Sequence, residues 1–203
     1  VEGTLRGWWT RLDRFHRWQL RQEAATLNHP RLRSIVCISR LVQEDIGRYH
    51  PQCLDKTEVI YNGVDCGYFQ PVSASDRRFL RLRHGLAADR FTLLFTGSGW
   101  QRKGLASVLR AMAACRNRRD LQLLVVGQDH RQARYYGLCR ALGLQEQVHF
   151  AGLQPHPLAF FQLADLFVLP SLYEPFSNAA LEALACACPL LVSPRCGVAE
   201  LVE

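Results

Sequence analysis

The chain has 203 residues, of which 48% are hydrophobic and 21% are charged, which is typical of a packed globular protein and excludes an intrinsically disordered one. It has no run of about 18 apolar residues, so no transmembrane helix is expected. The formal net charge of +7 is compatible with nucleic acid, an anionic membrane surface or phosphorylated substrates as partners, and equally with a solvated basic surface.

Eight cysteines are present, none in a pair separated by two residues, and several lie in apolar runs. This pattern predicts buried free thiols in a reducing cytoplasm. Cys186 and Cys188 lack further ligands at a useful spacing, so no metal site is expected. The ends of the chain resemble neither a leader nor a natural stop, and we therefore expect a fragment.

Residues 8–26 are predicted to form a basic helix, because Leu12, Phe15 and Trp18 recur near the helical period with arginines between them. The stripe fits the core of a domain, and it also fits an anionic membrane interface. Short apolar strands are then predicted at residues 34–39 and 57–61, with a helix over 41–49 between them.

A turn is predicted at Asn62–Asp65, and Pro71 with the polar residues after it indicates a linker. The sequence therefore predicts three parts. Residues 1–70 would be the C-terminal remnant of a first α/β domain, 71–76 a linker, and 77–203 a second domain that is truncated at its end.

The second domain alternates regularly between helices and strands. Helices are predicted at 77–84, 105–115, 131–142, 157–164 and 178–187, with another from 197, and strands at 91–96, 121–126, 148–151, 166–169 and 190–193. This order predicts a Rossmann-like parallel sheet with helices on both faces. Ligands of such sheets bind at the carboxyl ends of the strands.

The loop between the first of these strands and its helix runs from Gly97 through Ser98 and Gly99 to Gly104. Glycines allow a backbone to approach a ligand closely. Arg102 and Lys103 are expected at the start of the following helix, where they oppose its dipole, so an anion such as a diphosphate is favoured there. The alternative is a surface loop with two solvated cations.

Two further strands end at glycines, Gly127 and Gly152. The segment that ends at Asp129 is typical of the entrance to a site, and the backbone around Gly152 could contact a nucleobase. Both glycines fit simple turns equally well.

The most informative stretch is Leu169–Leu184, which is predicted to be a strand end, a turn and a helix start. Glu174 lies in the turn and Glu182 in the helix, with seven residues between them. The amides of Phe176, Ser177 and Asn178 would form an anion site at the helix start. A carboxylate accepts hydrogen bonds from sugar or ribose hydroxyls, so this stretch predicts a nucleotide-sugar site.

The spacing of Glu174 and Glu182, preceded by Ala164–Ser171, resembles the donor-binding signature of retaining GT-B glycosyltransferases of the group 1 (GT4) family. Asn62–Asp65 resembles the family's loop at the end of its first domain. Residues 97–104 and 125–129 are similar to its phosphate loop and central strand, most of all in the lipopolysaccharide core glucosyltransferases. The resemblance runs from about residue 15 to the end of the chain.

The resemblance implies a GT-B fold, of which this chain holds a nearly complete donor domain. It implies a retaining hexosyltransferase that needs no metal and takes a sugar from a nucleotide donor, a UDP-sugar such as UDP-glucose. Arg102, Lys103 and Glu174 would be catalytic, the cations stabilising the leaving diphosphate and Glu174 contacting the sugar. Glu182 would bind the ribose. The remaining donor-binding positions would be Gly97, Ser98, Gly99, Gly127, Gly152, Phe176, Ser177 and Asn178.

The acceptor implied is a saccharide or glycolipid, such as lipopolysaccharide core, and the location is the cytoplasm, with peripheral contact at an anionic membrane as an alternative. No nucleic-acid partner is expected, because the aromatic and basic cluster around Trp8, Trp9 and Trp18 is far in sequence from the phosphate loop. Ser177 stands where many relatives have glycine, and acceptor-facing residues of the first domain are missing, so the chain alone is expected to be inactive. A GT-B epimerase or hydrolase and a non-catalytic binding module remain alternatives.

Overall fold

The structure, a computed structural model, describes residues 14–115 and 118–202. Its contacts divide the chain into two units, Val1–Ile60 (unit 1) and Tyr61–Glu203 (unit 2), and each is described by itself. Trp8, Trp9, Leu12 and the first part of the helix predicted at 8–26 lie outside the described residues.

Unit 1 is small. In chain order it contains α2 (Arg14–Leu27), β1 (Ile35–Cys37), α3 (Arg40–Tyr49), the 3-10 helix η1 (Pro51–Lys56) and β2 (Thr57–Val59). β1 and β2 pair in parallel, and the hydroxyl of Ser39 caps α3 by accepting the amide of Val42. The two predicted strands and the helix between them are confirmed, whereas η1, which begins at a proline, was not predicted.

Helix α2 exposes its apolar residues within unit 1. The rings of Phe15 and Trp18 stack with centroids 6.0 Å apart, yet 61% of Phe15 and 56% of Trp18 remain accessible. The predicted apolar stripe therefore exists on the described part of the helix, and no described residue of unit 1 buries it.

Unit 2 is built on one five-stranded sheet. Its strands are β3 (Phe91–Thr96), β4 (Leu121–Val126), β5 (Val148–Gly152), β6 (Leu166–Leu169) and β7 (Leu190–Val192). Its helical segments are α4 (Ala74–Arg83), α5 (Trp100–Lys103), α6 (Leu105–Ala114), η2 (Arg118–Asp120), α7 (Gln132–Ala141), α8 (Leu158–Leu163), α9 (Asn178–Ala185) and η3 (Gly197–Leu201).

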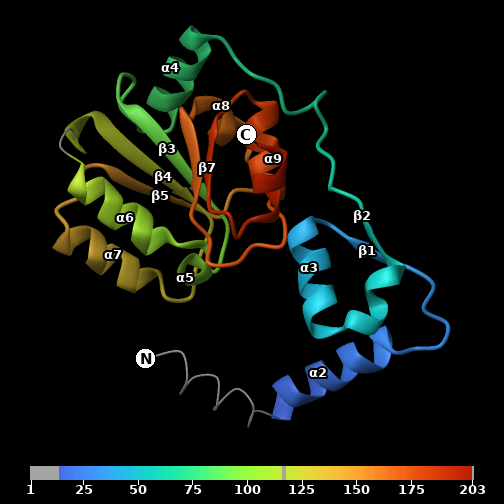
Figure 1. Ribbon diagram of the computed structural model, residues 1–203. Coiled ribbons are helices and arrows are strands. Elements are labelled where there is room, and N and C mark those ends of the chain that lie inside the picture. Colours follow the sequence, from blue (N-terminus) through green and yellow to red (C-terminus); the bar gives the residue numbers. More distant parts are fainter. Residues whose placement is uncertain (1–13, 116–117, 203) are drawn as a thin grey trace. The chain divides into compact units, whose positions relative to one another are not determined.

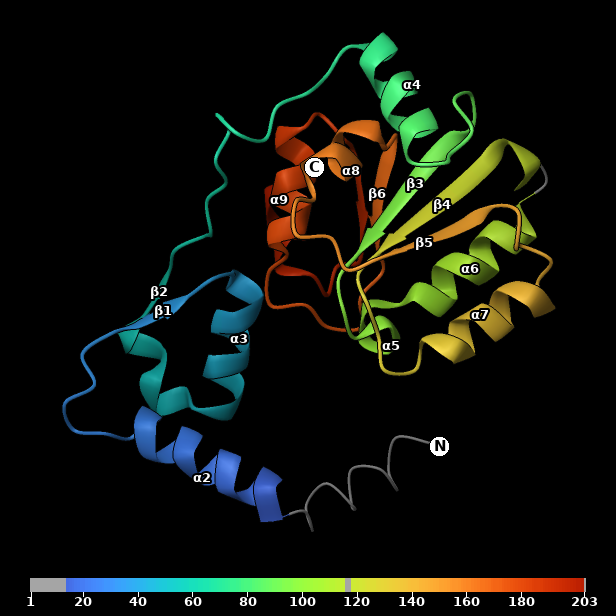
Figure 2. The same ribbon diagram turned by 180° about the vertical axis from the view of Figure 1, so that it is seen from behind.

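The strand order is β5-β4-β3-β6-β7, and every pairing is parallel. Helices α6 and α7 cover one face of the sheet, and α4, α8 and α9 cover the other (Figures 1 and 2). Because both faces are covered, the central strands are mostly apolar, and Leu94, Phe95 and Leu123 are fully buried. The predicted doubly covered parallel sheet is confirmed.

Four elements of unit 2 differ from the sequence prediction, and two of them, the short helix α5 and the 3-10 helix η2, were not predicted. Helix α4 begins at Ala74 and not at Arg77, because Ser73 caps it by accepting the amide of Asp76. The segment from Gly197 forms the 3-10 helix η3 over its first five residues and not an α-helix.

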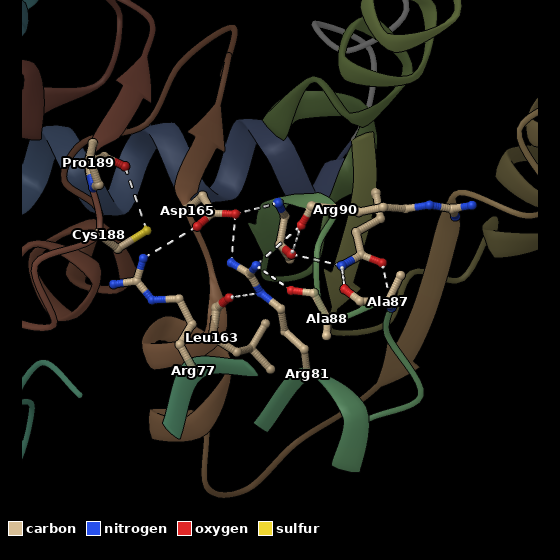
Figure 3. Close-up of polar contacts among 11 residues, drawn as sticks. Arg77, Arg81, Ala87, Ala88, Arg90, Leu163, Asp165, Cys188 and Pro189 are labelled. Carbon is tan, nitrogen blue, oxygen red and sulfur yellow. Dashed lines mark hydrogen bonds and ion pairs between the residues drawn. The ribbon is translucent and has the colours of Figure 1, made fainter. Parts of the chain in front are cut away.

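At the amino end of the sheet, Asp165 lies between Arg77 and Arg81 (Figure 3). Its carboxylate is 3.3 Å from Arg77 Nη1 and 2.6 Å from Arg81 Nη2, and it accepts the backbone amide of Thr92 at 2.7 Å. The contact between Arg81 Nη2 and Asp165 is an ion pair without hydrogen-bond geometry. We call these residues, Arg77, Arg81 and Asp165, the amino-edge cluster.

Candidate functional site

The site predicted from sequence lies at the carboxyl ends of β3 and β6. These strands are neighbours in the sheet, and the chain proceeds from β3 toward β4 on one side and from β6 toward β7 on the other. In open α/β sheets, the point at which the strand order reverses leaves a crevice where ligands bind. The loop of residues 97–104 follows β3 and the turn of residues 170–177 follows β6, so the two predicted motifs meet at this point.

Arg102 and Lys103 lie in the last turn of the short helix α5, which corrects their expected place at the start of the next helix. Gly104 separates α5 from α6 with φ 83°, and a Cβ at this residue would lie 2.3 Å from the carbonyl oxygen of Pro170. Only glycine satisfies both conditions, so the helix is broken here. Both cations thus complement the end of one helix and stand just before the start of another.

Arg102, Lys103 and Glu174, which we call the carboxyl-edge cluster, form a charged contact between the two loops. Glu174 Oε2 lies 3.0 Å from Arg102 Nη1 and 2.8 Å from Lys103 Nζ. Arg102 Nη1 also donates to the carbonyl oxygen of Tyr173 at 2.6 Å. The side chains of Lys103 and Glu174 are 13% and 10% exposed, whereas that of Arg102 is 47% exposed. The structure therefore brings together all three residues that were predicted to be catalytic.

The backbone of Glu174 is fixed from both sides. Its amide donates to the carbonyl oxygen of Arg195, and its own carbonyl oxygen accepts the amide of Gly197, each at 2.9 Å. These bonds form an isolated parallel bridge between Glu174 and Cys196. Only the side chain of Glu174 is left to move, and nothing in the sequence indicated this bridge.

The glycines at the ends of β3, β4 and β5 meet at the same edge. Gly97 donates to the carbonyl oxygen of Val126 and Gly127 donates to that of Gly152. A Cβ on Gly127, whose φ is 120°, would lie 2.4 Å from the carbonyl oxygen of Gly97. The close approach of two loops therefore requires glycine at position 127. A simple turn alone would not impose this requirement.

Asp129 joins the loop after β4 to α5, a connection that sequence reasoning missed. Its carboxylate accepts the backbone amide of Trp100, the first residue of α5, and that of Arg131, both at 2.8 Å. Burial acts to raise the pKa of Asp129, but the amides of Arg131 and Trp100, with the charges of His130 and Arg131, outweigh it and hold the pKa below its ordinary value. Asp129 therefore caps α5 across two loops and fixes the turn that carries the cations.

The turn before α9 offers unused donors. Ser177 caps the helix by accepting the amide of Ala180 through its hydroxyl. Within the described chain, no hydrogen bond uses the amides of Phe176, Ser177 or Asn178. These amides thus have no protein acceptor among the described residues, and the anion site at the helix start stays a prediction.

Residues before α4 support this turn. Asn62 donates to the side-chain oxygen of Asn178 at 2.7 Å, and the ring of Tyr61 lies 6.0 Å from that of Phe176. The loop that resembles the family's first-domain motif thus contacts the start of α9, a contact that the sequence did not predict.

Glu182 is placed differently from Glu174. It is half-buried on α9, and burial raises the pKa of its carboxyl group. No hydrogen bond or ion pair from the residues described reaches this carboxylate, so it lies outside the carboxyl-edge cluster. An added hydroxyl donor would satisfy it.

Three further observations concern metals, thiols and membranes. Among residues 14–115 and 118–202, no group of three or more His, Cys, Asp or Glu side chains could hold a metal ion. All eight cysteines are free, and six are buried as predicted, whereas the prediction of burial is wrong for Cys66 and Cys115, which are exposed. None of the described helices has the length and apolar character needed to cross a membrane.

Known proteins resemble the chain in sequence and in structure. Lipopolysaccharide glucosyltransferase WaaG of Escherichia coli K12 is 25% identical over 201 residues, which are 97% of this chain and 53% of WaaG. An uncharacterized glycosyltransferase of Methanocaldococcus jannaschii is 30% identical over 172 residues, covering 83% of this chain and 44% of that protein. The chain thus spans about half the length of the curated relatives it matches.

Among solved structures, WaaG superimposes with a TM-score of 0.84 at 24% identity, over 95% of this chain and 52% of that chain, which supports the GT-B fold. HepE of Anabaena, solved in complex with UDP and glucose, has a TM-score of 0.73 at 26% identity, over 84% of this chain and 47% of that one. The family described as glycosyl transferases group 1 matches residues 76–203. The chain therefore belongs to the group 1 glycosyltransferases.

Proposed function

We propose that this chain forms the donor-binding half of a retaining hexosyltransferase that uses a nucleoside diphosphate sugar, a UDP-sugar, without a metal ion. The observation that carries the proposal is the meeting of Arg102, Lys103 and Glu174 at the point where the strand order reverses. Cations for a diphosphate and an acceptor for sugar hydroxyls are thereby within one cluster. The complex of HepE with UDP and glucose supports the same class of donor.

In this proposal, catalysis is mainly stabilisation of the leaving group. Lys103 would act as a point charge and Arg102 as a fork of donors on the diphosphate, and the free amides of residues 176–178 would add hydrogen bonds. Because these groups are already held in place in the fold, little reorganisation is needed as negative charge develops. Glu174 would orient the sugar through its hydroxyls.

The remaining predicted residues would bind the nucleoside and line the diphosphate. Glu182 would accept the ribose hydroxyls, since its half-buried carboxylate lacks a protein donor among the described residues. Gly97, Ser98 and Gly99 would line the diphosphate, and the backbone at Gly127 and Gly152 would face the rest of the nucleotide.

The acceptor and location are also proposals. A saccharide or glycolipid such as lipopolysaccharide core is supported by the similarity to WaaG, whose name states that activity. A cytoplasmic protein with peripheral membrane contact is supported by the exposed rings of Phe15 and Trp18 on a basic helix. We retain the predicted order of a remnant of the acceptor domain (1–70), a linker (71–76) and a donor domain (77–203), although α4 begins at Ala74 within the predicted linker. We expect the chain alone to bind donor without transferring sugar.

Calorimetric titration of the 203-residue chain with UDP-glucose tests the proposal. Wild type should bind, and Glu182→Ala should weaken binding about 10-fold or more, equivalent to about 1.4 kcal/mol. Asp89→Ala, which removes a carboxylate from an exposed ion pair with Arg78 outside the site, is the control and should bind like wild type. No binding by wild type would refute the proposal, unchanged binding by Glu182→Ala would refute the ribose assignment, and release of free glucose would favour a hydrolase.

A further inference from the structure

Glu174 occupies the position at which the two cations would hold an anionic oxygen. One atom, Oε2, contacts both Lys103 Nζ at 2.8 Å and Arg102 Nη1 at 3.0 Å. The Lys103 and Glu174 side chains are nearly buried, so their mutual attraction is screened less than that of a surface pair. In the free protein, the carboxylate thus offsets one of the two positive charges that would hold a phosphate.

The carboxylate cannot withdraw with its backbone when a ligand arrives. The amide and carbonyl groups of Glu174 are both bonded, to Arg195 and Gly197 respectively. Only side-chain rotation is open to it, and this leaves the negative charge beside any phosphate on Lys103. Two like charges held in a partly buried site disfavour each other.

A nucleotide sugar and a bare nucleoside diphosphate interact differently with the negative charge of the Glu174 carboxylate. The terminal phosphate of the bare diphosphate has an additional ionisable oxygen with a pKa of about 6, and so carries more negative charge near neutral pH. In the nucleotide sugar that oxygen is esterified, and the sugar brings hydroxyl groups that can donate to the displaced carboxylate.

We propose that Glu174 competes with the ligand's phosphate for Arg102 and Lys103, so that the site selects a sugar-bearing diphosphate over the bare diphosphate product. This proposal rests on the proposed function. The residue thereby determines specificity within the donor site and assists product release, in addition to contacting the sugar. A neutral side chain of the same shape would relieve the competition for phosphate and lose part of the sugar contact.

Calorimetric titrations of wild type and Glu174→Gln with inorganic pyrophosphate, UDP and UDP-glucose test this proposal. Glu174→Gln should bind pyrophosphate and UDP about 5- to 10-fold more tightly, and UDP-glucose no more tightly than wild type does. Pyrophosphate makes the result independent of the base and the sugar. Asp89→Asn removes the same charge from an exposed ion pair and should change none of the three affinities.

Equal or weaker binding of pyrophosphate and UDP by Glu174→Gln would overturn the proposal while leaving nucleotide binding, and so the proposed function, intact. Failure of wild type to bind either nucleotide would refute both. If the variant does not fold, as judged by its melting curve, wild type alone decides. UDP-glucose should then bind at least about 5-fold more tightly than UDP, and tighter binding of UDP would overturn the proposal.

Discussion

The amino-edge and carboxyl-edge clusters of the sheet contain the same set of charges, one carboxylate between two cations, and use it in different ways. At the amino edge, Arg81 is 6% exposed and donates to the carbonyl oxygens of Leu163, Ala88 and Arg90. Asp165 also accepts the amide of Thr92. The protein itself thus supplies most of the hydrogen bonds that this ion pair requires (Figure 3).

At the carboxyl edge, Arg102 is 47% exposed and donates to one carbonyl oxygen among the described residues, that of Tyr173. The amides of residues 176–178, in the same turn as Glu174, have no partner in the part of the chain that the structure describes. The comparison shows that an ion pair alone does not identify a binding site. The exposure of the donors distinguishes the two clusters: the guanidinium of Arg102 is within reach of a ligand, whereas that of Arg81 is buried in the fold.

The largest expected effect comes from breaking the amino-edge cluster. Asp165→Ala leaves Arg77 and Arg81 without their shared carboxylate, and this should lower the free energy of unfolding by about 3–5 kcal/mol. Urea denaturation measures the loss. Asp89→Ala, in the exposed pair with Arg78, should change stability by about 0.5 kcal/mol or less. A similar small loss in both variants would contradict the structural role of the cluster.

A smaller effect on stability, accompanied by an effect on binding, is expected from Asp129→Ala. Losing the cap on α5 should lower the free energy of unfolding by about 1–2 kcal/mol and weaken UDP binding, because Arg102 and Lys103 lie on that turn. The pKa of Asp129 is lowered from 3.8, so its contribution is complete above that pH and is lost as the pH falls below it. The stability difference should therefore vanish in acid, and a pH-independent difference would count against the carboxylate cap.

The smallest effect should come from Glu182→Gln, and it should have the opposite sign. Burial raises the pKa of Glu182 from 4.5, so the charged carboxylate opposes folding increasingly as the pH rises above that value. The variant should be more stable than wild type near neutral pH, by less than about 1 kcal/mol, and equal to it in acid. It should also bind UDP-glucose more weakly. Thermal unfolding at several pH values checks the sign, and a destabilised variant would show that Glu182 has a structural partner.

Local patterns were sufficient to predict much of this fold. The largely apolar runs at residues 121–126 and 166–169 gave the bounds of β4 and β6 directly, because buried parallel strands are mostly apolar. The start of α4 at Ala74 was missed although Ser73 and Asp76 have the spacing of a helix cap. The strand order could not be predicted, because it depends on how distant segments pair.

For the site, residue types and spacing identified Arg102, Lys103 and Glu174, and the parallel sheet explained how they could meet. The direct contact of Glu174 with both cations was not foreseen, since it depends on side-chain positions across two loops. The same limit applies to the cap from Asp129 and the bridge at Cys196, which join segments far apart in sequence.

The central claim is that the carboxyl-edge cluster holds a diphosphate, and a crystal structure of this chain with bound UDP tests it most directly. We predict that phosphate oxygens lie within hydrogen-bond distance of Lys103 Nζ and of the amides of residues 176–178, with the Glu174 carboxylate turned away from Lys103. UDP bound elsewhere on the chain, with the contact between Lys103 and Glu174 intact, would contradict the claim.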